Sequence, residues 1–247
     1  MKRWLTCLLV VPLSWAPVLP AQQKPAVREL PVDITAEELR ARVEAAIGGA
    51  EAWKRVVSTV SRGVVEIEGV GKGKFEEYRR SPNLAFTRIV MDAGEESLEG
   101  CDGKIAWEKD SEGARALEGT LLREALYDCD FLHPFALGRS YKQLKIVGKA
   151  AQQEQEFYLV DAFRAGGEKE VLTILAGSYL PQLLVVQRQM EGQTITIPVV
   201  MSDYRSIGGL KLPHLLVSKL GGTKLTLRFD SIDANAPFDD AIFRLPK

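Results

Sequence analysis

The segment Glu99-Gly100-Cys101-Asp102-Gly103-Lys104-Ile105-Ala106-Trp107-Glu108 decides the fold. Asp102 and Gly103 can take the positive φ angles of a tight turn, so the segment predicts a β-hairpin with its tip at these two residues. On the returning strand, Ile105 and Trp107 point to one side, because side chains alternate between the two faces of a strand. We expect Trp107 to point inward, beneath helices that cover the sheet.

Strand follows strand through the second half of the sequence, with glycines in the turns between them. The predicted strands span residues 144–147, 156–163, 170–175, 182–190, 194–204, 211–219 and 224–232. Short strands at this spacing indicate an antiparallel, all-β meander. Alternating apolar and charged residues over 65–68, followed by segments 74–80 and 84–91, predict a similar series before the hairpin.

Two helical segments are the natural cover for one face of this sheet, since a sheet must bury its apolar face. The first begins at the capping box Thr35-Ala36-Glu37-Glu38 and continues with an apolar stripe at helical spacing, which comprises Leu39, Val43, Ala46 and Ile47. The second spans residues 117–127. The apolar segment 131–137 is broken by a proline, and a helix that covers the core is favoured there over a mobile flap.

The first residues have the organisation of a secretory signal peptide. Lys2 and Arg3 precede an apolar run over 4–11, and small residues mark a cleavage site after Ala21, with Ala16 as the alternative. The apolar run is too short to span a bilayer, which takes about 20 residues; a buried N-terminal helix is the other interpretation. The predicted layout is a signal peptide over 1–21, a flexible leader over 22–30 and a single β domain over 31–247, without a transmembrane segment in the mature, periplasmic chain.

Charge argues against a nucleic-acid partner. The chain of 247 residues carries 32 basic and 33 acidic residues, a formal net charge of −1. Removal of Lys2 and Arg3 leaves 30 basic against 33 acidic residues, so the mature chain has a net charge of −3. Binding to nucleic acid requires a clustered basic excess, which the alternating charges along the strands do not provide.

Two cysteines, Cys101 and Cys129, remain after the predicted cleavage. An exported protein meets an oxidising compartment, in which the two can pair as a disulfide; two separately buried thiols are the equal alternative. A metal site is not expected, because zinc requires about four clustered ligands. His133 and His214 are isolated, and each lies next to a proline.

Several turn and strand motifs resemble a known family. Gly73-Lys74-Phe75, Pro82-Asn83-Leu84 and residues 102–107 are similar to the periplasmic lipoprotein-carrier proteins of the Lol system, the LolA/LolB-like superfamily. Residues 201–205, 208–213 and 235–240 resemble exported proteins of the same superfamily that are related to outer-membrane lipoprotein sorting. The resemblance implies a mainly β (α+β) fold, namely a curved, incomplete antiparallel β-barrel with helices that form a lid over an apolar cavity.

The same resemblance implies a function. In the carriers the cavity holds lipoprotein acyl chains and an arginine holds the lid; Arg62 and Arg88 are both candidates for that arginine here. We expect a non-catalytic periplasmic binding or carrier protein for a lipid, a lipoprotein or another apolar ligand, without a cofactor. The candidate wall residues are Phe86, Trp107, Phe157, Leu172 and Ile197. For any single one of them, a plain core residue is the favoured alternative.

Two other functions stay open at this point. An open barrel has sheet edges, and an envelope scaffold could bind a partner protein by pairing a strand with such an edge. A hydrolase is less favoured, because it needs a nucleophile with a base in hydrogen-bond reach. The sequence has no Gly-x-Ser-x-Gly motif and only 2 histidines.

Overall fold

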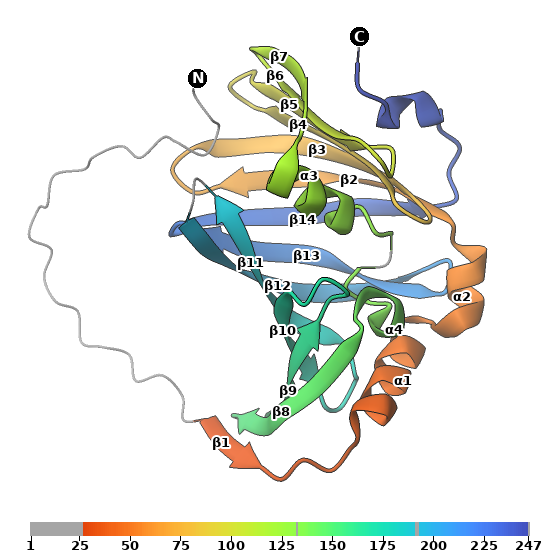
Figure 1. The fold of residues 1–247 in the computed structure, drawn as a ribbon, viewed down its shortest axis with the longest axis vertical. Helices are drawn as coiled ribbons and strands as arrows, with labels where there is room; N and C mark the ends of the chain where they lie inside the picture. Colours follow the sequence, from red (N-terminus) through yellow and green to blue (C-terminus); the bar gives the residue numbers. More distant parts are fainter. Residues whose placement is uncertain (1–26, 132, 191–192, 247) are drawn as a thin grey trace, which may run out of the picture.

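The structure is a computed structural model that describes residues 27–131, 133–190 and 193–246 (Figure 1). The predicted signal peptide and residues 22–26 of the predicted leader lie outside this part of the chain. The strands within it are β1 (Val27–Leu30), β2 (Ser58–Ile67), β3 (Gly71–Arg80), β4 (Leu84–Met91), β5 (Glu96–Cys101), β6 (Ala106–Asp110), β7 (Gly113–Ala116), β8 (Gln143–Gln152), β9 (Gln155–Phe163), β10 (Lys169–Leu175), β11 (Pro181–Met190), β12 (Gln193–Ile207), β13 (Leu210–Leu220) and β14 (Thr223–Ala234).

All of these strands belong to one 14-stranded sheet in the order β1-β8-β9-β10-β11-β12-β13-β14-β2-β3-β4-β5-β6-β7. Every described pair is antiparallel, and two meanders, β2 to β7 and β8 to β14, join where β14 pairs with β2. The sheet curves strongly, and the helices lie on its concave side (Figure 1). The predicted curved, antiparallel and incomplete barrel is confirmed; the sheet is not closed.

One part of the predicted leader is ordered as a strand. β1 pairs with β8, with Val27 opposite Gln152 and Leu30 opposite Lys149. Residues 27–30 are therefore not a flexible leader, because their backbone groups take part in the sheet. Periodicity could not reveal this strand, since a segment of four residues is too short to show it.

The helices are α1 (Ala36–Ile47), α2 (Gly49–Arg55), α3 (Gly119–Asp128) and α4 (Leu137–Ser140), together with a 3₁₀ turn, η1 (Asp240–Phe243). The predicted capping box starts α1, with the Thr35 side chain accepting from the Glu38 amide and the Glu38 side chain accepting from the Thr35 amide. Among the described helices, none is long and apolar enough to cross a bilayer.

The helices pack tightly on only one half of the concave side, since α1 has three buried residues and α3 has none. Leu39, Val43 and Ile47 of α1 are fully buried against β8 to β12, and Phe135, Leu137 and Tyr141 complete this core. Segment 131–137, described without residue 132, thus covers the core, as favoured from the sequence, but it is not the expected helix: residues 131 and 133–135 form turns, and α4 begins only at Leu137. The sheet residues of this cluster include Tyr158, Val160, Ala162, Leu172, Ile174, Leu184, Val186 and Met201.

The predicted hairpin lies between β5 and β6. Asp102 Oδ1 accepts hydrogen bonds from the amides of Lys104 and Ile105 at 2.9 Å and 2.8 Å, and Gly103 has a φ of +85°. A Cβ atom at Gly103 would lie 2.7 Å from Asn83 Oδ1. The turn therefore requires glycine both for its backbone and for its contact with the neighbouring hairpin.

Gly103→Val is expected to lower the free energy of unfolding by about 1–2 kcal/mol, because a branched side chain in a positive-φ turn is strained. Urea denaturation of the variant and the wild type measures the change. Lys104→Val, at the exposed neighbouring position, is the matched control and should stay within about 0.5 kcal/mol. Equal losses in the two variants would contradict this role of Gly103.

Trp107 points away from the helices. Its neighbour Ala106 packs against α3, and alternation along β6 places Trp107 on the opposite, convex face. There its indole Nε1 donates to the Phe243 carbonyl at 2.9 Å, and its ring lies 6.0 Å from that of Phe86. The expectation that Trp107 lies beneath the helices is therefore wrong, because the C-terminal segment with η1 covers this tryptophan.

Candidate functional site

Helix α3 crosses the open side of the curved sheet. It contacts β6 and β11, although seven strands separate those two in the sheet order. One helix can reach both only because the sheet bends around it. Figure 1 shows α3 in front of β2 and β14, the strands at the middle of this bend.

The packing beneath α3 is looser than that beneath α1. No residue of α3 is buried, and Leu121 is 41% exposed. Leu122, Ala125 and Leu126 are only partly buried where they pack against a small cluster, which consists of Cys101, Ala106 and Cys129. The strands behind α3 carry a separate apolar cluster on the same face, with Val65, Phe75, Met91, Phe229 and Ile232 buried. The residues around it are only partly buried, and they include Ile67, Ile89, Leu225 and Leu227.

Polar contacts from both sides hold the C-terminal end of α3. From β3, Arg79 donates to the Asp128 carbonyl at 2.7 Å and to the Asp130 carbonyl at 3.4 Å. From β11, Arg188 forms an ion pair with the Asp128 carboxylate at 2.6 Å. These two arginines therefore tie α3 to strands on opposite sides of the bend.

The arginines considered from the resemblance lie elsewhere. Arg62 pairs with Glu76 and Asp233, and Arg88 pairs with Glu76 and Glu96. Neither reaches α3, because both point to the convex face. Arg79, which contacts α3, was missed. It lies on the same face of β3 as Phe75, four residues earlier, and this spacing was the signal that could have found it, had the concave face been known.

A buried polar cluster fixes the chain that follows α3. Glu170 accepts from the Tyr141 hydroxyl at 2.5 Å and forms an ion pair with Arg164, and His133 Nε2 lies 3.5 Å from its carboxylate. The Arg164 guanidinium stacks 3.3 Å from the centre of the Tyr127 ring. The cluster thus connects the end of α3 to β9 and β10.

Burial sets the protonation of this cluster. It lowers the pKa of His133 well below its usual value, with the charge of Arg164 adding to the effect, and it raises the pKa of Tyr127 to about 12. His133 is therefore neutral and Tyr127 protonated near pH 7. The position of His133 within this aromatic and ionic cluster indicates a structural anchor.

Acidic groups lie at the β5–β6 side of α3. Glu99 and Glu108 are directly opposite each other on these strands, and Arg115 pairs with Glu108 at 2.9 Å. Partial desolvation and the charges of Glu108 and Asp128 raise the pKa of Glu99, although solvent still reaches its side chain. This side of the bend is therefore polar, in contrast to the apolar strands behind α3.

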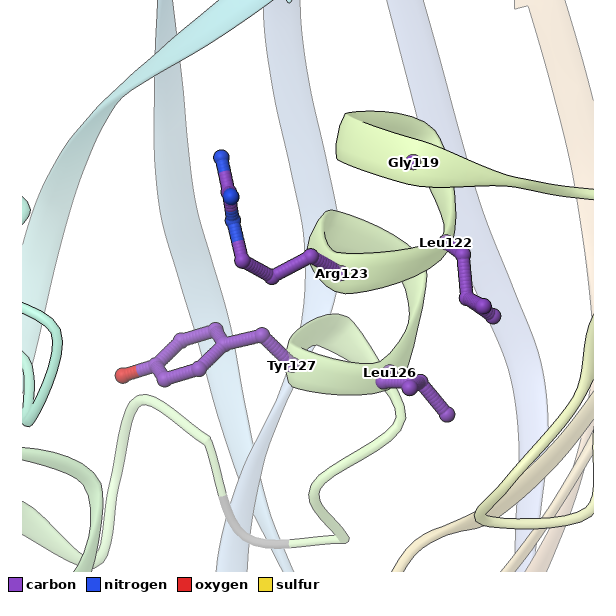
Figure 2. A pocket seen from close by; sticks show the side chains of 5 residues that line it. All are labelled: Gly119, Leu122, Arg123, Leu126 and Tyr127. Carbon is purple, nitrogen blue, oxygen red and sulfur yellow. The ribbon is translucent and has the colours of Figure 1, made fainter.

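A hollow of about 420 Å³ follows one face of α3. Its lining residues recur at helical spacing, and Figure 2 shows Leu122 and Leu126 pointing to one side of the helix and Arg123 and Tyr127 to the other. Gly119 completes the lining. Another hollow, of about 730 Å³, lies at the polar β8–β9 turn.

The structure does not bring the five candidate wall residues together. Phe86 and Trp107 contact each other on the convex face, and Phe157 points to that face because its neighbour Tyr158 is in the concave core. Leu172 is fully buried within the half filled by α1, and Ile197 packs at the edge of that cluster. Only Leu172 and Ile197 lie on the helix side.

Cys101 and Cys129 are free thiols, and both are buried in the cluster beneath α3. No group of three or more His, Cys, Asp or Glu side chains in the described part of the chain is arranged to hold a metal ion. A hydrogen bond between the two thiols lowers the pKa of Cys101 and raises that of Cys129. The two sulfur atoms are thus neighbours across the contact between α3 and β5.

Solved structures share this fold. A DUF1329 family protein from Desulfovibrio piger matches with a TM-score of 0.58 at 14% identity, over 83% of this chain and 94% of that one. A LolA superfamily protein from Nitrosomonas europaea matches with a TM-score of 0.56 at 11% identity, over 86% and 98%. An outer membrane lipoprotein-sorting protein domain from Vibrio parahaemolyticus matches with a TM-score of 0.56 at 9% identity, over 83% of this chain and 94% of that one. No family model and no curated protein matches the sequence.

Proposed function

We propose that this chain is a non-catalytic binding or carrier protein of the bacterial envelope, which takes an apolar ligand such as a lipid or a lipoprotein acyl chain between α3 and the concave sheet. The observation that carries the proposal is the contrast between the two halves of the concave side. One half is filled by fully buried residues of α1, whereas α3 buries none of its residues over the other. The shared fold with a LolA superfamily protein supports the same function.

The energetics favour an apolar chain in this position. Removal of apolar surface from water contributes about 25 cal/mol per Å², so burial of about 300 Å² of acyl chain contributes about 7.5 kcal/mol. Displacement of α3 breaks the contacts of Arg79 and Arg188, at a cost of about 1–3 kcal/mol for each of the two arginines. The ligand thus offsets the cost of moving the helix.

The proposed wall consists of the half-buried residues behind α3, with Ile67, Ile89 and Leu227 at its centre. Ile89→Asn is expected to weaken the binding of a fluorescent fatty acid by about fivefold or more, because it places an amide against the acyl chain. A fivefold change in affinity corresponds to about 1 kcal/mol of binding free energy. Fluorescence titration of the full chain measures the affinity.

Val90→Asn is the matched control, since Val90 is the next residue of β4, is also half-buried, and points to the convex face. Its affinity for the probe should equal that of the wild type. Equal weakening in both variants would remove the concave face from the site. A wild type that does not bind the probe would refute the binding function itself.

Arg79→Leu is expected to loosen α3, because the hydrogen bonds from the guanidinium to the Asp128 and Asp130 carbonyls are lost. We expect faster association of the fatty-acid probe in stopped-flow fluorescence, together with a loss of stability of about 1–3 kcal/mol. Arg88→Leu, a change of the same kind on the convex face, should leave the association rate unchanged. An unchanged rate in Arg79→Leu would contradict the movement of α3.

The alternatives find less support. The edge strands β1 and β7 span four residues each, and short edge strands hinder pairing with another chain. A hydrolase would need a nucleophile beside an accessible base, whereas His133 is buried among tyrosines and Arg164. Export to the periplasm is part of the proposal, and mass spectrometry of the exported chain, with a start at Gln22, would test it.

A further inference from the structure

The two cysteines lie on opposite sides of the contact between α3 and the sheet. Cys129 is the residue that caps the C-terminal end of α3, and Cys101 is the last residue of β5. Their exposed fractions are 7% and 1%. Around them pack half-buried apolar residues of α3 and of β4, so the thiols lie in the most buried part of an otherwise loose contact.

The two thiols lie in one small buried cluster, which Ala106 completes. Their interaction shifts the pKa of both cysteines, and the Gly103 amide donates to Cys101 Sγ at 3.4 Å. The third cysteine, Cys7, belongs to the predicted signal peptide and lies outside the described residues. Two thiols alone do not complete a zinc site, which takes about four ligands.

We propose that Cys101 and Cys129 form a disulfide that fastens the C-terminal end of α3 to β5 and thereby restricts access to the apolar face beneath the helix. The bond and its effect on α3 stand on the position of the two thiols alone. The restriction of access rests on the proposed binding function.

The reaction is a thiol–disulfide exchange with an external disulfide, such as oxidised glutathione or the active-site disulfide of an oxidoreductase. The Cys101 thiolate attacks one sulfur of the oxidant, forms a mixed disulfide and releases the first thiol. Cys129 then attacks Cys101 Sγ, forms the bond between the two residues and releases the second thiol. Two electrons and the two thiol protons pass to the oxidant, which becomes two thiols.

Hydrogen bonding supports Cys101 as the attacking group. The bond from the Cys129 thiol lowers the pKa of Cys101, as does the bond from the Gly103 amide, and the charge of Arg79 acts in the same direction. A lowered pKa increases the fraction of thiolate, which is the reactive form. Because both thiols are buried, the oxidant reaches them only when α3 moves away from β5.

The bond would change the way in which α3 is held. Arg79 and Arg188 fasten this end of the helix by reversible polar contacts. A covalent bond at the adjacent residue cannot open while the protein is oxidised. A ligand would then reach the apolar face only past the N-terminal end of α3, the turn that contains Gly119 and Leu122.

The test uses the protein as exported by a bacterial host, from which the predicted cleavage after Ala21 removes Cys7. Cys7→Ser is made as well, so that any uncleaved chain also has only the two relevant thiols. One sample is treated with oxidised glutathione and the other with dithiothreitol. Alkylation with N-ethylmaleimide in denaturant followed by intact-mass measurement counts the free thiols, and hydrogen exchange of residues 119–128 reports on α3. Cys101→Ser and Cys129→Ser are separate controls, so that the failure of one to fold leaves the other.

We expect the oxidised protein to resist alkylation, its α3 amides to exchange about tenfold more slowly, and its melting temperature to rise by about 5–15 °C. Neither serine variant should respond to the oxidant. Free thiols after oxidation, or a bond that leaves the exchange of α3 unchanged, would overturn the proposal.

Association of cis-parinaric acid with both redox forms adds a separate readout. Slower association with the oxidised form supports restricted access, and equal rates would overturn that part. If the probe binds neither form, the proposed binding function fails, whereas alkylation and hydrogen exchange still decide the disulfide.

Discussion

Trp107→Ala is expected to lower the free energy of unfolding by about 3–5 kcal/mol, the usual effect of emptying a buried aromatic site. Trp107 is 2% exposed. It is enclosed by Phe86, by Gly100 on the neighbouring strand β5 and by the C-terminal segment. The variant also leaves the buried Phe243 carbonyl without its donor. Guanidinium denaturation, followed by far-UV circular dichroism, measures the loss.

The affinity for a fluorescent fatty acid should stay unchanged in the folded Trp107→Ala protein, because Trp107 lies on the convex face. Trp107→Phe is the milder variant: it keeps one six-membered ring and loses the Nε1 donor together with the rest of the indole, so its loss should be smaller than that of Trp107→Ala, with about 1–3 kcal/mol from the hydrogen bond. A weaker affinity in either variant, at full folding, would return Trp107 to the binding site and contradict the placement described above.

Glu170→Ala is expected to destabilise the protein by about 3–5 kcal/mol, because removal of one partner leaves a buried charge unpaired. Arg164 would lose its buried carboxylate, and the Tyr141 hydroxyl would lose its acceptor. The anchor of the chain after α3 would weaken as well, so hydrogen exchange of residues 133–141 should increase together with the loss of stability.

Glu168→Gln is the control for Glu170→Ala. Glu168 is an exposed acid in the adjacent turn, and its carbonyl, rather than its side chain, accepts from the Arg164 amide. Its effect should stay within about 0.5 kcal/mol. If the two variants lose similar stability, the cluster around Glu170 does not act as a buried anchor.

Local signals in the sequence predicted most of the elements. The capping box at Thr35 and the glycine turns predicted α1 and the strands of the second half closely, because these patterns act over a few residues. They did not predict η1 or the cluster around Glu170, whose partners come from separate elements. A pattern of local periodicity contains no information on such contacts.

The error over Trp107 has a specific cause. Alternation correctly placed Ala106 and Trp107 on opposite faces of β6, but it cannot say which face the helices cover. That choice was made by residues far along the chain, since Phe238 and Phe243 cover the convex face near Tyr78 and Trp107. The same uncertainty hid Arg79, which shares its face with Phe75.

The junction between β14 and β2 bears on how the chain folds as it is made. Ala234 pairs with Thr59, so the two meanders join only after almost the whole chain has been synthesised. Until then Phe75 lacks Phe229, whose ring lies 5.0 Å away in the finished sheet. Contacts between such distant residues form slowly, and the incomplete N-terminal meander exposes an apolar face that favours aggregation. We therefore expect the nascent chain to depend on chaperones that keep it unfolded until its last strand is available.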